Sequence, residues 1–193
     1  MRQPGPETHK ANQNLTDTEI IDKIRQSGSG EDFGILYIRY YSKVLDKCLS
    51  MVRNRSQAME LAEDVFIKAF EKLPSFRHQS TFSSWLYTIT YNHCVDHLRE
   101  KKKLHYPKWN TDNELPDLAE EPEESEEKID YGKMMEILEL IHPEEKALIM
   151  MKYQDNLSVK QIGQALRISD AAVKMRLKRA RTRIFTLYRS RFM

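Results

Sequence analysis

Apolar residues recur every three or four positions along most of the chain, which predicts a protein built from helices. The clearest case is a C-terminal helix whose apolar residues form one stripe at alternating steps of four and three. The stripe consists of Val173, Leu177, Ala180, Ile184 and Leu187. Ser169 is the predicted N-cap of this helix, and Ser158 with Gln161 forms a capping box that starts a shorter helix before it. Two helices joined by a fixed corner are therefore expected.

The same periodicity predicts further helices earlier in the chain. A helix begins after the capping box of Thr16 and Glu19, and the aromatic-rich segment 33–52 forms the next one. Segment 56–73 follows, and Pro74 ends it. Another helix is expected from the N-cap Thr81 through Arg99, and a further one from Ile129 to Ile141. Pro143 suits the first position of the next helix, which precedes the two helices described above.

Composition supports an all-α fold and narrows the class of protein. The chain has 193 residues, and it lacks the alternation of apolar and polar residues that marks strands. Its longest apolar run, 147–151, is too short for a membrane span, and the first residues lack an apolar signal core. Cys48 and Cys94 form no C-x-x-C pair, which fits a reducing compartment. A cytoplasmic protein without membrane insertion is expected.

Charge is segregated along the chain although the net charge is only +2. Residues 111–127 carry nine acidic residues and two prolines but no Lys or Arg, which is typical of a solvated linker. A disordered start over residues 1–15, a first domain over 16–103, a flexible acidic linker over 104–130 and a second domain over 131–193 are predicted. The fold is thus two small helical domains.

The C-terminal helix has a cationic side opposite its apolar stripe. With about 100° per residue, one line of side chains lies farthest from the stripe and a second group flanks it. The outermost line is Ala171, Met175, Lys178, Arg179 and Thr182, and the flanking cations are Lys174, Arg176, Arg181 and Arg183. A recognition helix in the DNA major groove needs this division, because outermost side chains reach bases and flanking cations hold phosphates. An ordinary amphipathic helix with a solvated basic face is the alternative.

The predicted helix 56–73 carries three acids on one side, Glu60, Glu63 and Asp64. The pair Glu60 and Asp64 has the spacing at which like charges repel. A solvated face relieved by Lys68, a docking surface for a basic partner and a paired-carboxylate enzyme are the alternatives that this pattern leaves open.

The loop after Pro74 and the helix that follows it mix aromatic, cationic and amide side chains, which suits single-stranded nucleic acid. The mixed set is Phe76, Arg77, His78, Tyr87, Tyr91, Asn92, His93 and Arg99. His93, Cys94 and His97 offer three metal-ligand types on one helix, without a fourth at the usual spacing. No metal and no cofactor are therefore expected.

The run IGQALRISDAAVKMRLKRARTRI resembles region 4 of bacterial sigma factors, whose pattern is roughly E-I-A-x-x-L-G-I-S-x-x-T-V-K-x-R-x-x-R-A-R. The matching residues are Ile162, Leu166, Ile168, Ser169, Val173, Lys174, Arg176, Arg179, Ala180 and Arg181. Arg167 stands where the family usually has Gly, and Ala172 where it usually has Thr. By itself this half is also similar to the C-terminal domain of two-component response regulators.

The block 31–103 resembles sigma region 2 of the extracytoplasmic-function type, in the order that the family has. The matches are Ala58, Glu60, Phe66, Ala69, Phe70, Leu73 and Phe76, followed by Thr81, Phe82, Trp85, Leu86, Ile89, Asn92, Asp96 and Arg99. Met59 and Glu63 depart from the pattern, on the surface that in this family docks on a coiled coil of the largest polymerase subunit.

The resemblance implies a sigma factor that binds core RNA polymerase and directs promoter recognition and melting. Core polymerase would contact Glu60, Leu61, Glu63, Asp64, Phe66, Ile67 and Phe70. The −10 element would contact Phe76, Arg77, His78, Ser80, Thr81, Trp85, Tyr91, Asn92, Asp96, Arg99 and Lys102. The −35 element would contact Ser169, Ala171, Lys174, Met175, Arg176, Lys178, Arg179 and Arg183.

The partners implied are core RNA polymerase and promoter DNA, and an anti-sigma factor is a further candidate. The protein is not expected to be an enzyme. The alternative is a helix-turn-helix transcriptional regulator that acts without docking on core polymerase.

Overall fold

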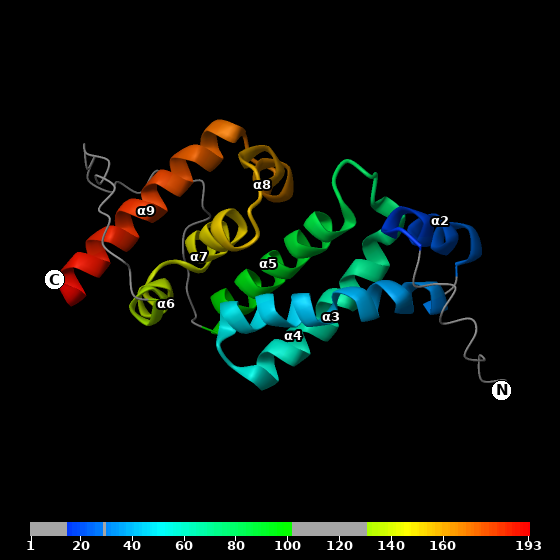
Figure 1. The fold of residues 1–193 in the computed structure, drawn as a ribbon, viewed down its shortest axis with the longest axis horizontal. Coiled ribbons are helices and arrows are strands. Elements are labelled where there is room, and N and C mark those ends of the chain that lie inside the picture. The colour runs from blue at the N-terminus through cyan, green and yellow to red at the C-terminus, as the bar shows by residue number, and fades with distance from the viewer. Residues whose placement is uncertain (1–14, 29, 102–130) are drawn as a thin grey trace. The chain divides into compact units, whose positions relative to one another are not determined.

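The computed structural model describes residues 15–28, 30–101 and 131–193, and every regular element within these ranges is helical (Figure 1). The chain divides into two compact units, Met1–Cys94 and Val95–Met193. The first helices are α2 (Asp17–Ser27), α3 (Gly30–Val52), α4 (Arg55–Lys72), the 3-10 turn η2 (Leu73–Ser75) and α5 (Phe82–Lys101). They are followed by α6 (Tyr131–Leu140), α7 (Pro143–Ile149), the π-helical turn η3 (Met150–Gln154), α8 (Val159–Leu166) and α9 (Asp170–Phe192). The all-α prediction is confirmed.

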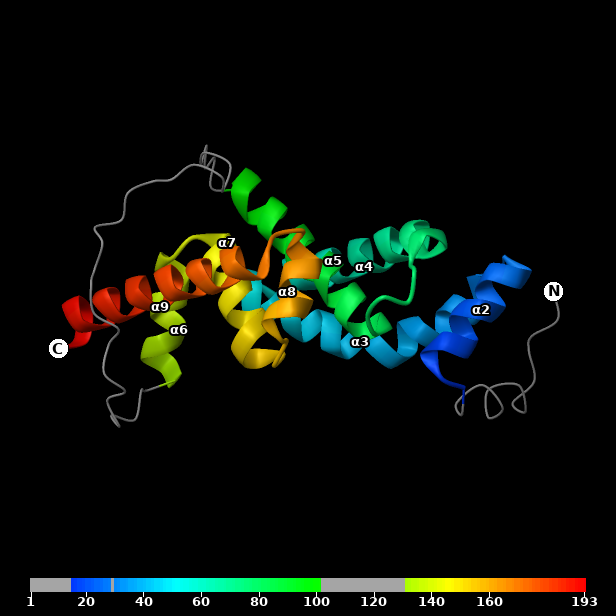
Figure 2. The ribbon, with the colours of Figure 1, turned by 90° about the horizontal axis from the view of Figure 1, so that it is seen from above.

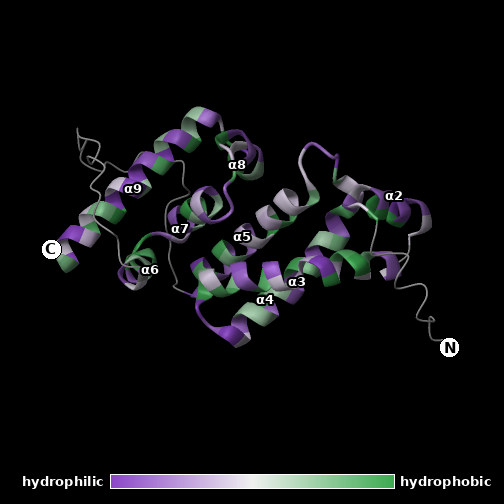
Figure 3. Ribbon diagram, in the orientation of Figure 1, coloured by the Kyte–Doolittle hydropathy of each residue, from purple (hydrophilic) through white to green (hydrophobic). Residues whose placement is uncertain are grey.

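Helices α3 and α4 pack side by side, because a connection of two residues reverses the chain between them (Figures 1 and 2). Arg53 takes a left-handed conformation in this connection, and the Asn54 side chain caps α4 by accepting from the Gln57 amide at 3.0 Å. The apolar sides of both helices are buried, as the hydropathy colouring suggests (Figure 3). The core residues of these two helices include Leu36, Val44, Cys48, Met51, Leu61, Ala62, Val65 and Ala69.

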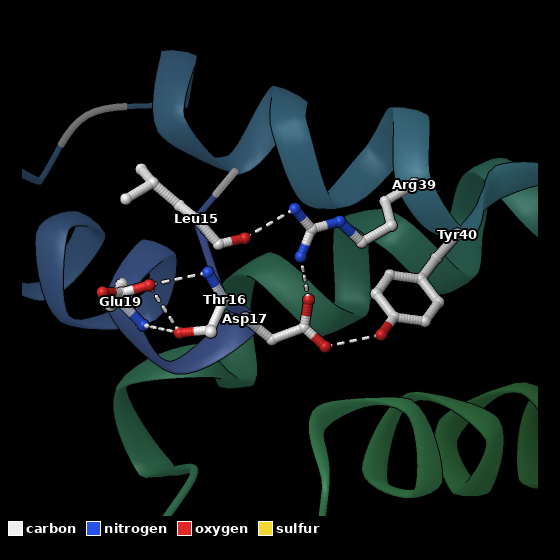
Figure 4. Close-up of polar contacts among 6 residues, drawn as sticks. All are labelled: Leu15, Thr16, Asp17, Glu19, Arg39 and Tyr40. Atoms are coloured by element: carbon white, nitrogen blue, oxygen red, sulfur yellow. Dashed lines mark hydrogen bonds and ion pairs between the residues drawn. The ribbon is translucent and has the colours of Figure 1, made fainter. Parts of the chain in front are cut away.

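Helix α2 is fixed to α3 by one carboxylate (Figure 4). Asp17 accepts from the Tyr40 hydroxyl and from Arg39 Nη1, both at 2.5 Å, while Arg39 Nη2 donates to the Leu15 carbonyl at 2.8 Å. Burial and the hydrogen bond to Asp17 raise the pKa of the Tyr40 phenol, so the phenol remains a donor across the physiological pH range. The predicted capping box of Thr16 and Glu19 starts α2, which confirms that expectation.

The second unit has a core between α6 and α9, and the short helices α7 and α8 also pack against α9. Ile137, Leu138, Ile141 and Ile184 form this core, with Leu187 and neighbouring residues packed against it. Pro143 occupies the first turn of α7, as predicted. In the described part of the chain no helix is both long and apolar enough to cross a membrane. The predicted linker 104–130 and the start 1–14 lie outside the described residues.

Candidate nucleic-acid interface

The corner between α8 and α9 is built as the sequence predicts at both caps. Ser158 and Gln161 form the capping box of α8, and the Ser169 side chain accepts from the Ala172 amide at 3.2 Å to start α9. The two helices come close at Gly163, where an added Cβ would lie 2.9 Å from the Ile168 carbonyl oxygen. The crossing therefore requires glycine at position 163.

Arg167 ends α8 in a left-handed conformation, with φ 55° and ψ 44°. This is the turn position where the family pattern has Gly, so the turn keeps its conformation although Arg occupies it. A side chain raises the energy of this conformation, because Cβ approaches the following carbonyl oxygen. The corner thus has the expected shape at an added conformational cost.

Arg167→Gly is accordingly expected to stabilise the second unit by about 0.5–1 kcal/mol, since Gly relieves the steric cost but loses more backbone entropy on folding. Urea denaturation of the two proteins measures the difference. Arg167→Ala is the matched control, because it removes the same guanidinium while keeping Cβ. A gain in stability of the same size in the control would assign the effect to the guanidinium instead of the backbone.

The buried stripe of α9 lies where its spacing predicts, whereas Thr182, predicted on the outermost line, is half-buried. Val173, Leu177, Ala180 and Ile184 are buried. On the outermost line Ala171, Lys178 and Arg179 are exposed and Met175 is 52 % exposed, and the flanking cations Lys174 and Arg181 are exposed too. An apolar side chain exposed to that extent on a cationic face is suited to contact with a base methyl group. The exposed side of α9 thus combines potential base contacts with phosphate-binding cations.

Arg176 lies half-buried at the edge of this cationic face. Burial lowers the pKa of its guanidinium, and the nearby charge of Arg179 lowers it further. The positive charges of Arg176 and Arg179 therefore repel each other in the isolated protein. A phosphate at this edge would relieve the repulsion between the two guanidinium groups.

Arg183, another predicted −35 residue, has its side chain engaged within the domain. Its Nη1 atom lies 3.0 Å from Glu145 Oε2, so it joins α9 to α7. Glu145 also accepts from the His142 amide at 3.2 Å, at the start of α7. The arrangement favours a role in positioning α9 over a direct phosphate contact.

Arg183→Ala is expected to lower the free energy of unfolding of the second unit by about 0.2–1 kcal/mol, the range for partly exposed ion pairs. Thermal unfolding measures this loss. Arg181→Ala, which removes the same charge from an exposed position two residues away, should leave the stability nearly unchanged. If the two variants were equally stable and both bound every DNA sequence with equally reduced affinity, Arg183 would instead be a phosphate-contacting residue.

Four predicted −10 residues of α5 share one side of that helix. Trp85, Asn92, Asp96 and Arg99 are separated by seven, four and three positions, and Asn92 and Asp96 are exposed. Thr88 lies between them on the same side and was not predicted, although its spacing of three from Trp85 and four from Asn92 could have identified it. Tyr91, which was also predicted as a −10 residue, is fully buried, so its side chain belongs to the core.

The loop before α5 has a buried anchor and an exposed tip. Phe76 is 3 % exposed and packs against Trp85 and Phe82, with ring centroids 5.0 and 6.1 Å away. Arg77 and His78 are exposed, Ser80 is half-buried, and Thr81 caps α5 through the Ser84 amide at 3.2 Å. The exposed tip therefore offers side chains next to the α5 face. Lys102, the remaining predicted −10 residue, lies outside the described residues.

The exposed side of α4 combines acids with large apolar side chains. Glu60, Glu63 and Asp64 are exposed, and Ile67 and Phe70 are 58 % and 42 % exposed. Met59, which the sequence marked only as a departure from the pattern, is exposed beside them. Leu61 and Phe66, which were also predicted as contacts, are each 3 % exposed, and the Phe66 ring packs against aromatic rings of α3. We call the set Met59, Glu60, Glu63, Asp64, Ile67 and Phe70 the α4 face.

Asp64 has a partner within the first unit. Its Oδ2 atom lies 3.2 Å from His93 Nε2 on α5, and Lys68 Nζ lies 2.6 Å from His93 Nδ1. Because Lys68 can only donate, His93 accepts at Nδ1 and donates to Asp64. Within the described residues Asp64 is thus joined to α5 by a hydrogen bond, whereas Glu60 and Glu63 show no hydrogen bond to another helix.

Within residues 15–28, 30–101 and 131–193, no group of three or more His, Cys, Asp or Glu residues could hold a metal ion. His93 is instead engaged with Lys68 and Asp64, and Cys94 is buried.

Comparison with known proteins matches both halves of the chain. Residues 36–104 match the family model for sigma-70 region 2, and residues 131–184 match that for sigma-70 region 4. The ECF RNA polymerase sigma factor SigW of Bacillus subtilis is 29 % identical over 177 residues, covering 84 % of this chain and 92 % of that protein. The RNA polymerase sigma factor YlaC of the same organism is 29 % identical over 149 residues, covering 76 % of this chain and 86 % of YlaC.

Solved structures show the same fold. CnrH in complex with the cytosolic domain of CnrY has a TM-score of 0.61 at 18 % identity, covering 91 % of this chain and 98 % of that chain. The sigma factor RpoE of Bartonella quintana, in complex with the anti-sigma factor NepR, has a TM-score of 0.57 at 19 % identity, covering 82 % of this chain and 98 % of that chain.

Proposed function

The chain belongs to the sigma-70 family of RNA polymerase sigma factors, in its extracytoplasmic-function group, and from this we propose how its surfaces divide the work of initiation. The domain over 16–103 holds core polymerase through the α4 face and binds the −10 element through α5 and the loop before it. The domain over 131–193 reads the −35 element as duplex through α9. The segment 104–130 joins the two as a tether.

The observation that carries this assignment is the division of α9 into a buried stripe and an exposed cationic side behind a capped corner. Lys178 and Arg179 lie on the outermost line, so they are placed to reach base edges when the helix enters the major groove. Lys174 and Arg181 flank them and are placed to contact phosphates. The helix thus combines sequence-specific base contacts with electrostatic contacts to phosphates.

Docking on core polymerase distinguishes this function from that of a helix-turn-helix regulator. The α4 face supports docking, since exposed apolar side chains next to acids suit a partner that offers both apolar contact and positive charge. Co-purification of tagged protein with core polymerase tests it. A regulator without a docking surface would be recovered free of polymerase while still binding DNA.

We propose that α5 and its loop bind the non-template strand of the −10 element as it melts. Asn92, Asp96 and Trp85 offer hydrogen-bonding and stacking groups along one side of α5, as single-stranded DNA requires. Arg77 and His78 extend this surface into the loop. The proposed contacts with single-stranded bases require no catalytic group, and the protein is proposed to act without being an enzyme.

An anti-sigma factor is a further proposed partner, because one solved structure of the same fold is a sigma factor in complex with an anti-sigma factor. Such a partner would have to cover surfaces that the free protein uses for polymerase or DNA. Affinity capture from cells grown without induction, followed by competition with core polymerase, tests whether the partner and polymerase exclude each other.

A further inference from the structure

Helix α2 contacts the loop between η2 and α5 mainly through the side chain of Arg25. Arg25 donates from Nη2 to the Phe76 carbonyl oxygen, and its Nη1 atom lies 3.1 Å from His78 Nε2. Asp22, one turn earlier on α2, has its Oδ1 atom 3.8 Å from both Arg25 Nη1 and His78 Nε2. Arg25 therefore joins two loop residues that lie more than fifty positions away in sequence.

The loop needs such support, because His78 has a left-handed backbone conformation with φ 54°. Few residues with a side chain adopt this conformation, and those that do depend on the surrounding structure to hold them there. Phe76 fixes one end of the turn by burial, and its ring lies 4.8 Å from the His78 ring, centroid to centroid. Arg25 contacts both the carbonyl of the buried residue and the side chain of the strained one.

The contact with Arg25 determines which ring nitrogen of His78 accepts a hydrogen bond. The Arg25 guanidinium has only donors, so His78 Nε2 must accept and its proton must lie on Nδ1. Among the described residues with contacts to this ring, Asp22 is the one acid and Arg25 the one cation.

We infer that Arg25 is a positioning residue for the loop 76–81, which it holds in the conformation that reads the −10 element. The inference rests on the proposed function of this loop. Arg25 acts through the loop, because its contacts are with the Phe76 carbonyl oxygen and the His78 ring. Fixing the turn before DNA arrives removes the ordering cost from binding, and it holds Arg77 and His78 in one orientation toward the melted strand.

The test uses the full chain assembled with core polymerase and transcription from a promoter library randomised across the −10 element. Arg25→Ala should reduce the base preference at the position that the loop reads by about tenfold, as for the loss of one base contact. Preferences within the −35 element and affinity for core polymerase should be unchanged. Arg25→Lys can donate to only one of the two acceptors at a time, so it should keep an intermediate preference.

Lys23→Ala is the matched control, since it removes one positive charge from an exposed position on the same helix. It should leave the −10 preference unchanged. The double variant Arg25→Ala, His78→Ala should lose no more of the −10 base preference than either single variant loses, because both residues act through one turn. A merely structural role of Arg25 would instead lower the melting temperature and reduce activity at all promoters equally.

Arg77→Ala separates failure of this inference from failure of the proposed function. If Arg77→Ala changes the −10 preference and Arg25→Ala leaves it intact, the loop reads DNA without help from α2, and the inference is overturned. If neither variant changes it, the loop does not read the −10 element, and both ideas fail. A tenfold loss in Arg25→Ala, with partial retention in Arg25→Lys, supports the positioning role.

Discussion

Replacing Glu60 and Glu63 together by lysine is expected to abolish binding of core polymerase while the helical fold remains intact. Both side chains are exposed on the α4 face, beside the apolar side chains of Ile67 and Phe70. A partner with positive charge at this position would meet like charges, which costs several kcal/mol. An affinity loss of more than about a hundredfold follows from a cost of that size.

Pull-down of core polymerase together with circular dichroism measures binding and fold in the same preparations. The matched control is Asp46→Lys with Glu100→Lys, which makes the same change of charge at exposed positions on α3 and α5. It should bind polymerase normally. If the Glu60→Lys, Glu63→Lys protein also bound normally, the α4 face would not be the docking surface.

The second large effect is expected from Arg179→Ala, which should relax sequence preference within the −35 element. Arg179 is exposed on the line opposite the buried stripe of α9, so its guanidinium can reach a base edge. Loss of a bidentate base contact costs roughly 1–3 kcal/mol, or about five- to 150-fold in affinity for the preferred sequence. Affinity for altered sequences should change much less.

Lys174→Ala is the comparison for this prediction. Lys174 is exposed at the flank of α9, where it should contact phosphate. Its replacement should therefore lower the affinity for all DNA sequences by a similar factor. The salt dependence of binding should then fall by about one counterion. Titration of both variants at several salt concentrations measures this, and identical, sequence-independent losses would show that the faces of α9 are assigned wrongly.

The helices and their caps were predictable from the sequence, because these features depend on residues three and four positions apart. The stripe through Val173, Leu177 and Ile184 is buried as its spacing indicates, and Ser158 and Ser169 cap the helices that they precede. The same local logic predicted the start of α2 at Thr16. Local periodicity also gave the correct cationic side of α9.

Contacts between distant segments were not predictable in this way. Arg183 looked like a phosphate-binding residue, because periodicity gives the direction of a side chain but not the partner it meets on α7. Local periodicity gives no sign of the role of Arg25 for the same reason, since its acceptors lie in another part of the chain. Phe66 matched the family pattern of a docking helix, but it lies in the core, where it supports the exposed residues.

The most direct test of the account is transcription in vitro by core polymerase over a library of genomic fragments, with and without the purified protein. The account predicts new transcripts that start at defined sites, require both −35 and −10 elements, and disappear with the Glu60→Lys, Glu63→Lys protein. Transcripts from core polymerase that are identical in number and start site with and without the protein, while the protein binds DNA by itself, would contradict it.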